Sequence, residues 1–156
     1  MGISHPYLAI LATVAFIGVV ISMFSLFFYI VDQVNKTPIL GVYAEAYINY
    51  NGSVDVVITV EHKRGKPVEI KSILLFNETS VIVLENLENS ELILLNSCRK
   101  RYTFVGGICR IILVFPSGVF AEDKIYSGLV IFSEGSYPIA FTPIKPLEYI
   151  LKQYTS

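Results

Sequence analysis

The chain has 156 residues, of which 53% are hydrophobic and only 16% are charged. This length allows one folded domain and a shorter segment, because single domains are commonly about 100–150 residues long. The mean hydropathy of +0.59 exceeds that of ordinary soluble domains, so part of the surface is expected to contact lipid or other protein. The net charge is −1 and no basic cluster alternates with aromatic residues, which excludes nucleic acid as an expected partner.

An apolar segment without any charged residue runs from Tyr7 to Val31. It exceeds the length of about 20 residues that a helix needs to span a bilayer. Pro6 falls in the first turn, where a proline is tolerated, so the predicted helix covers Ile3–Asn35 and is about 50 Å long. Pro38 ends the pattern, because the residue before a proline avoids the helical conformation.

These signals predict two parts of the chain. Residues 1–36 form a hydrophobic N-terminal helix that serves as a filament core or a membrane anchor, and residues 37–156 form an extracytoplasmic domain. A removable signal peptide is disfavoured, because the basic n-region and the small-residue cleavage site of such peptides are missing.

Small residues recur along the predicted helix at spacings of three or four positions. They predict close packing between helices, since small side chains let two backbones approach each other. The alternative is a simple anchor in which these residues fall together by chance. The predicted packing residues are Ala9, Ala12, Ala15, Gly18, Ser22 and Ser25.

The two cysteines, Cys98 and Cys109, lie close together and cannot complete a tetrahedral zinc site by themselves. A disulfide is the favoured interpretation, and it indicates an oxidising compartment or the cytosol of some hyperthermophiles. Two buried free thiols in neighbouring strands are the alternative. Three Asn-x-Ser/Thr sequences, at Asn35, Asn51 and Asn77, are candidate N-glycosylation sites and also favour a location outside the cell.

Beyond the helix the hydrophobic period changes to two, which is typical of strands, and Asn51-Gly52 predicts the first hairpin turn. The predicted strands are Val42–Ile48, Val54–Glu61, Val68–Phe76, Ser80–Glu85, Glu91–Leu95, Tyr102–Val105, Ile108–Phe115, Ile125–Ser133 and Tyr137–Thr142. About eight or nine short antiparallel strands without a further helix predict an all-β, immunoglobulin-like sandwich. Its strands are more apolar than one buried face requires, so another subunit is expected to cover part of the excess.

No residue pattern in the sequence points to a catalytic site. Ser117 lacks the preceding glycine and the following helix of a nucleophile elbow. His5 begins the hydrophobic segment, and His62 is expected at the surface in a charged turn. The sequence therefore predicts a protein that is not an enzyme and that uses no catalytic residue, metal or cofactor.

A long apolar helix occurs here with a first strand that opens at Gly41-Val-Tyr43 and with a late hairpin pattern over Tyr126–Tyr137. In this architecture the chain resembles the archaeal type IV pilin and archaellin superfamily. The resemblance implies that the helix packs into a filament core and that the sandwich faces outward. Precursors in that superfamily carry a leader that is cut before the helix, whereas only Met1-Gly2 precedes Ile3 here. Either a leader has been removed, or the chain is closer to the uncleaved archaellum stator subunits.

The resulting hypothesis is a structural subunit of an extracellular archaeal pilus-like filament that serves adhesion or cell–cell contact. Such a subunit would insert into the membrane before assembly, polymerise with itself as a helical homopolymer, and carry N-linked glycans or contact an S-layer. The alternative is a single-helix, membrane-anchored envelope binding module similar to an archaellum stator subunit.

Overall fold

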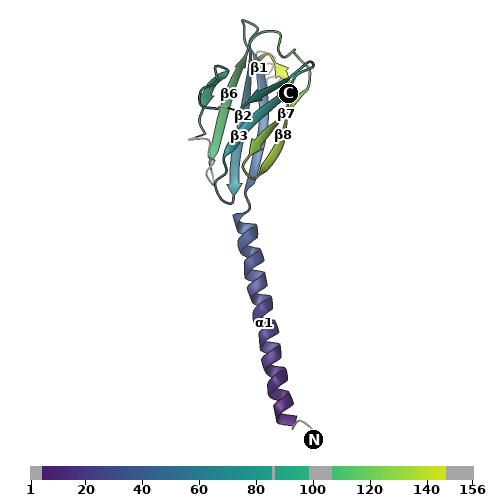
Figure 1. Cartoon of the computed structure of the whole chain (residues 1–156). Coiled ribbons are helices and arrows are strands. Elements are labelled where there is room, and N and C mark those ends of the chain that lie inside the picture. Colours follow the sequence, from purple (N-terminus) through teal and green to yellow (C-terminus); the bar gives the residue numbers. More distant parts are fainter. Residues whose placement is uncertain (1–4, 86, 99–106, 147–156) are drawn as a thin grey trace, which may run out of the picture. The chain divides into compact units, whose positions relative to one another are not determined.

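The computed structural model describes residues 5–85, 87–98 and 107–146 (Figure 1). The chain divides into two compact units, Met1–Thr37 and Pro38–Ser156. This division falls one residue after the boundary that the sequence predicts. The predicted class, a long apolar helix followed by an immunoglobulin-like sandwich of mostly antiparallel strands, is confirmed.

The N-terminal unit contains one α-helix, α1 (His5–Lys36), which has 32 residues. At a rise of 1.5 Å per residue, it is about 48 Å long. In its last turn, Lys36 Nζ lies 2.6 Å from Asp32 Oδ2. The helix ends where Thr37 Oγ1 donates to Gln33 O at 2.9 Å, one residue before Pro38. The predicted start at Ile3 lies outside the described residues.

The described part of the second unit contains nine strands, with these bounds: β1 (Ile39–Ile48), β2 (Val54–Arg64), β3 (Ile70–Phe76), β4 (Val81–Leu84), β5 (Ile93–Asn96), β6 (Ile108–Phe115), β7 (Tyr126–Phe132), β8 (Gly135–Phe141) and β9 (Pro143–Ile144). The strands β2, β3, β6, β7 and β8 alternate between buried and more exposed residues over most of their length, as expected where one face of a strand contacts a core. The predicted strand over residues 102–105 lies outside the described residues, and β9 was not predicted.

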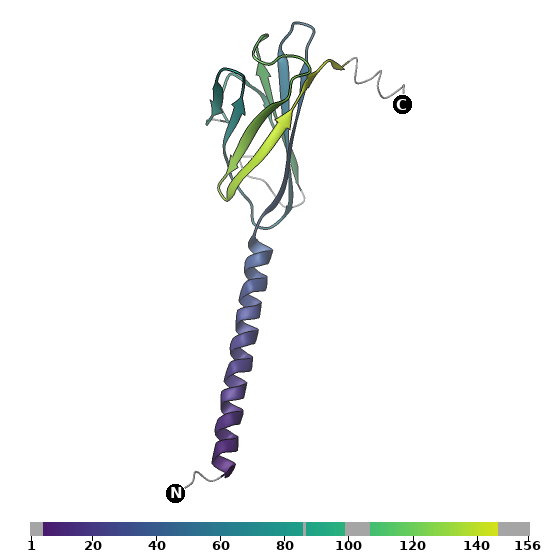
Figure 2. The same ribbon diagram turned by 90° about the vertical axis from the view of Figure 1, so that its right-hand side faces the viewer.

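The strands form two sheets, which are the two layers of the sandwich (Figures 1 and 2). One has five strands in the order β5-β6-β2-β1-β9, and the other has four in the order β4-β3-β7-β8. The blue strands β1 and β2 belong to the first layer, and the green β7 and yellow-green β8 belong to the second. All neighbouring pairs are antiparallel except β1 and β9, which are parallel and join the first strand of the sandwich to its last.

The β1–β2 hairpin shows how the Asn51-Gly52 signal acts. Asn49 N–H donates to Ser53 O at 2.9 Å, so the loop has three residues instead of the two of the tightest hairpins. Gly52 N–H donates to Asn49 O at 2.9 Å, and Gly52 has a φ of 83°. This is a turn followed by a left-handed residue, which explains why glycine is needed at position 52.

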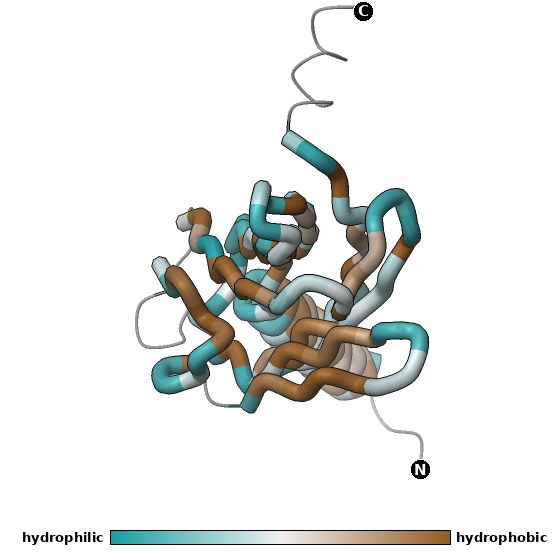
Figure 3. Tube along the Cα trace, turned by 90° about the horizontal axis from the view of Figure 1, so that it is seen from above, coloured by the Kyte–Doolittle hydropathy of each residue, from teal (hydrophilic) through white to brown (hydrophobic). Residues whose placement is uncertain are grey.

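The core lies between the two sheets, and it is built from the inward side of every long strand. Figure 3 shows brown, hydrophobic strand segments separated by teal turns. The largest fully buried side chains include Phe115, Ile58, Ile70, Ile73, Leu75, Leu87, Ile111 and Leu113. His62 also lies in this core, with 0% of its surface exposed, so its predicted surface placement is wrong.

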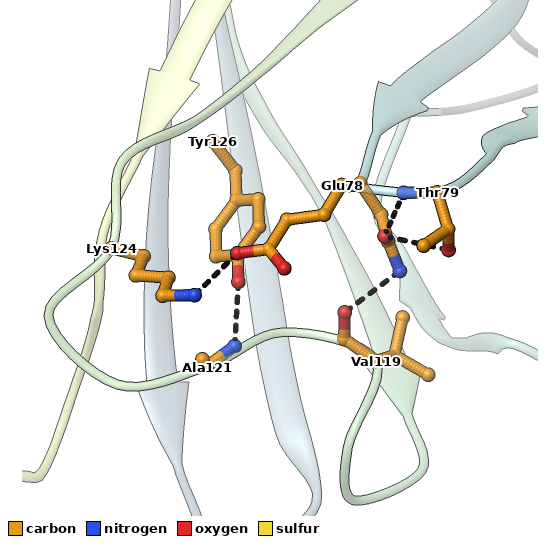
Figure 4. Close-up of polar contacts among 7 residues, drawn as sticks. Glu78, Thr79, Val119, Ala121, Lys124 and Tyr126 are labelled. Atoms are coloured by element: carbon orange, nitrogen blue, oxygen red, sulfur yellow. Dashed lines mark hydrogen bonds and ion pairs between the residues drawn. The ribbon is translucent and has the colours of Figure 1, made fainter.

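An aromatic cluster closes one end of the core. Phe120 makes edge-to-face contacts with Phe115, Tyr126 and Phe141, with ring centroids 4.8 to 5.2 Å apart. The Tyr126 hydroxyl accepts a hydrogen bond from Ala121 N–H at 2.8 Å (Figure 4). A tyrosine near the start of a late strand that bonds back to the upstream backbone is a recurring feature of immunoglobulin-like sandwiches. It fixes the loop that enters β7.

The same loop, between β6 and β7, is bonded to the β3–β4 turn at two places, through Asn77 and through Glu78 (Figure 4). Asn77 Nδ2 donates to Val119 O at 2.9 Å, and Asn77 Oδ1 accepts from Thr79 N–H at 2.9 Å. Lys124 Nζ donates to Glu78 Oε1, and this hydrogen bond and the charge of Glu78 raise the pKa of the Lys124 ammonium above its ordinary value. The turn and the loop therefore hold each other in place.

Gly128 lies at a position of β7 where the neighbouring strand leaves no room for a side chain. A Cβ atom at this position would lie 2.5 Å from Leu74 O and 2.8 Å from Leu75 Cδ2. The first of these atoms is backbone, so a rotamer change could not remove the clash. The sandwich therefore needs glycine here because of its packing, without any unusual φ.

Candidate interaction surfaces

The helix α1 presents an apolar surface on every side. None of its residues is buried within its unit, and its most apolar window has a mean hydropathy of 2.5. Two of its hydroxyl groups are satisfied internally, because Thr13 Oγ1 donates to Ala9 O at 2.8 Å and Ser22 Oγ donates to Gly18 O at 2.9 Å. In hydrocarbon an unsatisfied hydroxyl would be costly. By length and composition, α1 is able to cross a bilayer.

The regular helix narrows the predicted packing stripe. At about 100° per residue, Ala15, Gly18, Ser22 and Ser25 fall within an arc of about 80° on one side. Ala12 falls outside this arc, and Ala9 lies on the side opposite Gly18. The close approach predicted from the sequence is therefore centred on the middle of the helix, although no contact in the structure tests it.

Cys98 and Cys109 form a disulfide bond, with their Cα atoms 5.0 Å apart. The pairing of β5 with β6 places Leu95 opposite Ile112 and Asn96 opposite Ile111, so the two cysteines lie where this antiparallel ladder continues. Backbone bonding continues too, since Ser97 N–H donates to Arg110 O at 2.9 Å. The disulfide therefore holds the ends of β5 and β6 together and joins the chain between the two cysteines into a covalent loop.

The three candidate glycosylation sites differ in their surroundings. Asn35 is exposed in the last turn of α1, and Asn51 is exposed in the β1–β2 loop, where its Oδ1 accepts from Ser53. Asn77 is half-buried, and its Nδ2, the atom to which a glycan would be attached, donates to Val119 O. Asn35 and Asn51 are thus accessible, whereas the Asn77 amide is part of the fold. Glycosylation itself stays a prediction.

Cross-strand pairing on the outer side of the four-stranded sheet gives three rows without a charged residue, and the exposed Lys71 lies beside the third row, at the bulge between Ile70 and Ser72. Strand pairing sets these rows. The first row is Val83, Leu74, Leu129 and Pro138; the second is Val81, Phe76, Ser127 and Ala140; the third is Ser72, Ile131 and Ser136. We call these eleven residues the uncharged face. Val81 and Val83 each keep 52% of their surface exposed.

The outer side of the five-stranded sheet is different. Its cross-strand rows include four charged residues, Glu45, Asp55, Glu61 and Arg110. Tyr47 Oη also donates to Glu45 Oε2 at 2.7 Å. This side has the mixed character of a solvated sheet face, whereas a contiguous apolar face is unusual on a protein that acts alone. The uncharged face accounts for part of the apolar excess that the sequence led us to expect another subunit to cover.

The side chains that were considered as candidate catalytic residues do not form a common site. Ser117 is exposed in the loop before β7, and His62 is buried in β2, where its Nε2 lies 3.0 Å from Arg64 O. His5 is exposed at the start of α1. Within the described ranges, no group of His, Cys, Asp or Glu side chains could hold a metal ion. The features that stand out in the described structure are surfaces, and we consider them as interaction sites.

No family model and no curated protein sequence matches the chain. Among solved structures, the chain is similar to the archaellum periplasmic stator protein FlaG from Sulfolobus acidocaldarius, with 10% identity, a TM-score of 0.43, and coverage of 65% of this chain and 97% of that one. A chain of the FlaF and FlaG stator complex from that organism gives 11% identity, a TM-score of 0.41, and coverage of 61% and 84%. The M1 domain of titin gives 14% identity, a TM-score of 0.36, and coverage of 70% and 95%. None of these comparisons shows membership of the archaeal type IV pilin and archaellin superfamily, so that resemblance stays a prediction.

Proposed function

We propose that the chain is a single-helix membrane-anchored protein of the cell envelope, which holds its sandwich outside the cytoplasm to bind another protein. One observation carries this proposal: an apolar helix of 32 residues with no buried residue precedes a sandwich whose four-stranded sheet carries three uncharged rows on its outer side. The helix accounts for the anchor, and the face accounts for the binding role.

Anchoring is supported by the cost of leaving α1 in water. Large side chains around the whole helix, such as Leu11, Phe16 and Phe24, keep 60% or more of their surface exposed within the unit. Burying one such side chain contributes about 1.5–3 kcal/mol, so the helix as a whole strongly favours lipid or other helices over water. Its length of about 48 Å exceeds the hydrocarbon thickness of about 30 Å, which leaves room for a tilted span or a projecting end.

An extracytoplasmic location for the sandwich is supported by the Cys98–Cys109 disulfide, since such bonds persist in oxidising compartments. The exposed acceptor sequence at Asn51 is compatible with this side of the membrane. We further propose that the sandwich acts by binding and not by catalysis. This agrees with the scattered positions of Ser117 and the two histidines.

A filament subunit is the second candidate. The arc of Ala15, Gly18, Ser22 and Ser25 favours it, because small residues on one side of an apolar helix permit close helix packing. In that case α1 would pass from the membrane into the core of a helical homopolymer, and the sandwich would serve adhesion or cell–cell contact. Both candidates place the sandwich outside the cell, so they differ only in what surrounds the helix.

The anchor is tested by extracting membranes that contain the full chain with alkaline carbonate. We expect the protein to stay in the membrane fraction until detergent is added. Ser117→Cys adds a free thiol, because both native cysteines are bonded to each other. A membrane-impermeant maleimide should label this variant on intact cells. Release by carbonate, or labelling only after lysis, would contradict the proposal.

The two candidates are separated by shearing cells and identifying the main component of any fibres by mass spectrometry. Fibres made of this chain, with an N-terminus produced by leader cleavage, would favour the filament subunit. In that case Gly18→Leu should abolish fibres without preventing membrane insertion, whereas Val20→Leu, on the opposite side of α1, should not. A chain found only in detergent-solubilised membranes supports the anchored module.

A further inference from the structure

The turn between β2 and β3 has the sequence Lys63-Arg64-Gly65-Lys66-Pro67, in which three residues are basic and none is acidic. We call these five residues the basic turn. We propose that the basic turn binds the phosphate groups of anionic lipids in the membrane that holds α1, so that one end of the sandwich rests on that membrane. This inference rests on the proposed membrane-anchored function. Three features support the contact: the place of the turn in the fold, its distance from the helix and its charge.

The basic turn lies at the end of the sandwich where the chain enters from α1. Ile39, the first residue of β1, pairs with Arg64, the last residue of β2. At the other end of β2, Val54 pairs with Phe115, the last residue of β6. The 11 residues of β2 separate these two ends by about 30 Å. We call them the entry end and the far end, and only the entry end is joined directly to the helix.

The covalent chain keeps the entry end close to the lipid surface. Asp32 is the first charged residue after the apolar segment, so it marks the level at which α1 leaves the hydrocarbon. Lys36 lies about 6 Å further along the helix, and the chain from Lys36 to Ile39 spans at most about 10 Å. Ile39 therefore stays within about 16 Å of that level at any angle between helix and sandwich. Lipid headgroups form a layer about 5–8 Å thick there, so the entry end can reach them.

The side chains of the basic turn are available to bind phosphate. Arg64 is exposed, and no ion pair or hydrogen bond occupies its guanidinium in the described structure. A guanidinium can donate two parallel hydrogen bonds to phosphate oxygens. Lys63 Nζ lies 3.8 Å from Glu61 Oε2, and Lys66 Nζ lies 2.9 Å from Glu134 Oε1. Exposed ion pairs of this kind are weak, so these two lysines can also turn towards a phosphate.

Charge also favours the entry end over the far end as the contact surface. The β6–β7 loop at the far end carries Glu122 and Asp123 with one base, Lys124. An anionic membrane surface repels this loop and attracts the basic turn. At the entry end, Ile39 and Ile108 keep 42% and 61% of their surface exposed. Basic and apolar side chains together suit the boundary between headgroups and hydrocarbon.

A fluorescent label on the basic turn tests the contact in the full chain, reconstituted into vesicles. Pro67→Cys adds a thiol without changing the charge of the turn, and only this thiol can be labelled because the native cysteines are bonded to each other. A nitroxide on lipid headgroups quenches the label at short range. We expect several-fold stronger quenching in phosphatidylcholine vesicles with added phosphatidylglycerol than in phosphatidylcholine alone, and a loss of this difference at high salt. Ser117→Cys, at the far end, should show no difference.

Substitutions show which charges are responsible. Arg64→Gln removes the guanidinium but keeps the backbone oxygen that His62 contacts. One basic side chain near an anionic surface favours contact about five-fold, so the extra quenching should fall by about this factor. Lys66→Gln should act in the same direction. Lys145→Gln is its matched control, because both lysines are paired with a glutamate and keep 55% of their side-chain surface exposed, but Lys145 follows β9 at the far end. It should leave the quenching unchanged.

The fold of each variant is checked by thermal unfolding. If Pro67→Cys lowers the melting temperature, Ser133→Cys gives a second label position, because Ser133 is exposed in the β7–β8 turn, next to the Glu134 that Lys66 contacts.

The outcomes separate this inference from the proposed function. If the label at the basic turn is quenched equally in both kinds of vesicle while the protein resists carbonate, binding of anionic lipid is wrong and the anchored module stands. The same conclusion follows if Arg64→Gln and Lys145→Gln behave alike. If carbonate releases the protein, the anchor itself is wrong. Only quenching that depends on both anionic lipid and Arg64 supports the inference.

Discussion

Replacing Gly128 with alanine should destabilise the sandwich, although it adds only one methyl group. The new Cβ would lie 2.5 Å from Leu74 O, 2.8 Å from Leu75 Cδ2 and 3.2 Å from Ile139 Cγ1. Ordinary contacts of this kind are longer than about 3.4 Å, so β7 must move away from β3 by almost 1 Å. Overpacking of this kind costs about 1–3 kcal/mol, and we expect the upper end because the nearest atom is backbone.

The assay is thermal unfolding of the full chain in detergent, followed by circular dichroism of the strands. For a unit of this size, 3 kcal/mol corresponds to a melting temperature lowered by about 10 °C. Gly18→Ala is the matched control, because nothing lies within 4 Å of a Cβ built there, and it should leave sandwich melting unchanged. A Gly128→Ala protein that melts within about 2 °C of the parent would refute the reasoning, since it would show that the strands separate at no cost.

Three further predictions concern the sandwich. Replacing Cys98 and Cys109 with serine opens a loop of sequence separation 11 and should lower the free energy of unfolding by about 3 kcal/mol, measured by denaturant titration with reductant-treated parent protein as a comparison. Tyr126→Phe removes the hydroxyl acceptor of a backbone N–H and should cost about 1 kcal/mol in the same titration; an unchanged midpoint would mean that water replaces the hydroxyl. The raised pKa of Lys124 stabilises the folded state below the ordinary value of 10.5, and this contribution disappears as the pH rises through the raised pKa. Glu78→Gln should therefore lower the melting temperature near pH 9 and lose its effect at strongly alkaline pH, and a pH-independent difference would exclude the ion pair as its cause.

The pattern of hydrophobic and polar residues within short segments was sufficient to predict most helices and strands of the fold. The uncharged run from Tyr7 to Val31 identified α1, and period-two alternation identified the strands. The surface placement predicted for His62 was wrong because the charged residues next to it were given more weight than the strand alternation. His62 was assigned to a turn because Glu61, Lys63 and Arg64 surround it, yet it continues the inward series of β2 that begins at Val54. The alternation predicted burial, and the local charge obscured it.

Strand order depends on contacts between distant segments, and so it could not be predicted. The two-residue strand β9 has no pattern of its own and exists because β1 has a free edge beside it. The excess of apolar residues in Ser72–Phe76 indicated a covered surface. Only the pairing of β3 with β4 and β7 shows that the outward residues of these strands join into one face. The need for glycine at position 128 likewise follows from atoms of another strand.

The parallel contact between β1 and β9 has a consequence for the timing of folding. Ala46 pairs with Pro143, so the first and last strands of the sandwich are neighbours in space although they come from opposite ends of its sequence. Contacts of such high sequence separation form slowly, and a chain is synthesised from its N-terminus. The apolar helix is therefore complete and able to enter a membrane long before Ile144 exists. During that interval β1 lacks its final neighbour, so the backbone groups along this edge stay unpaired until the last strand has been made.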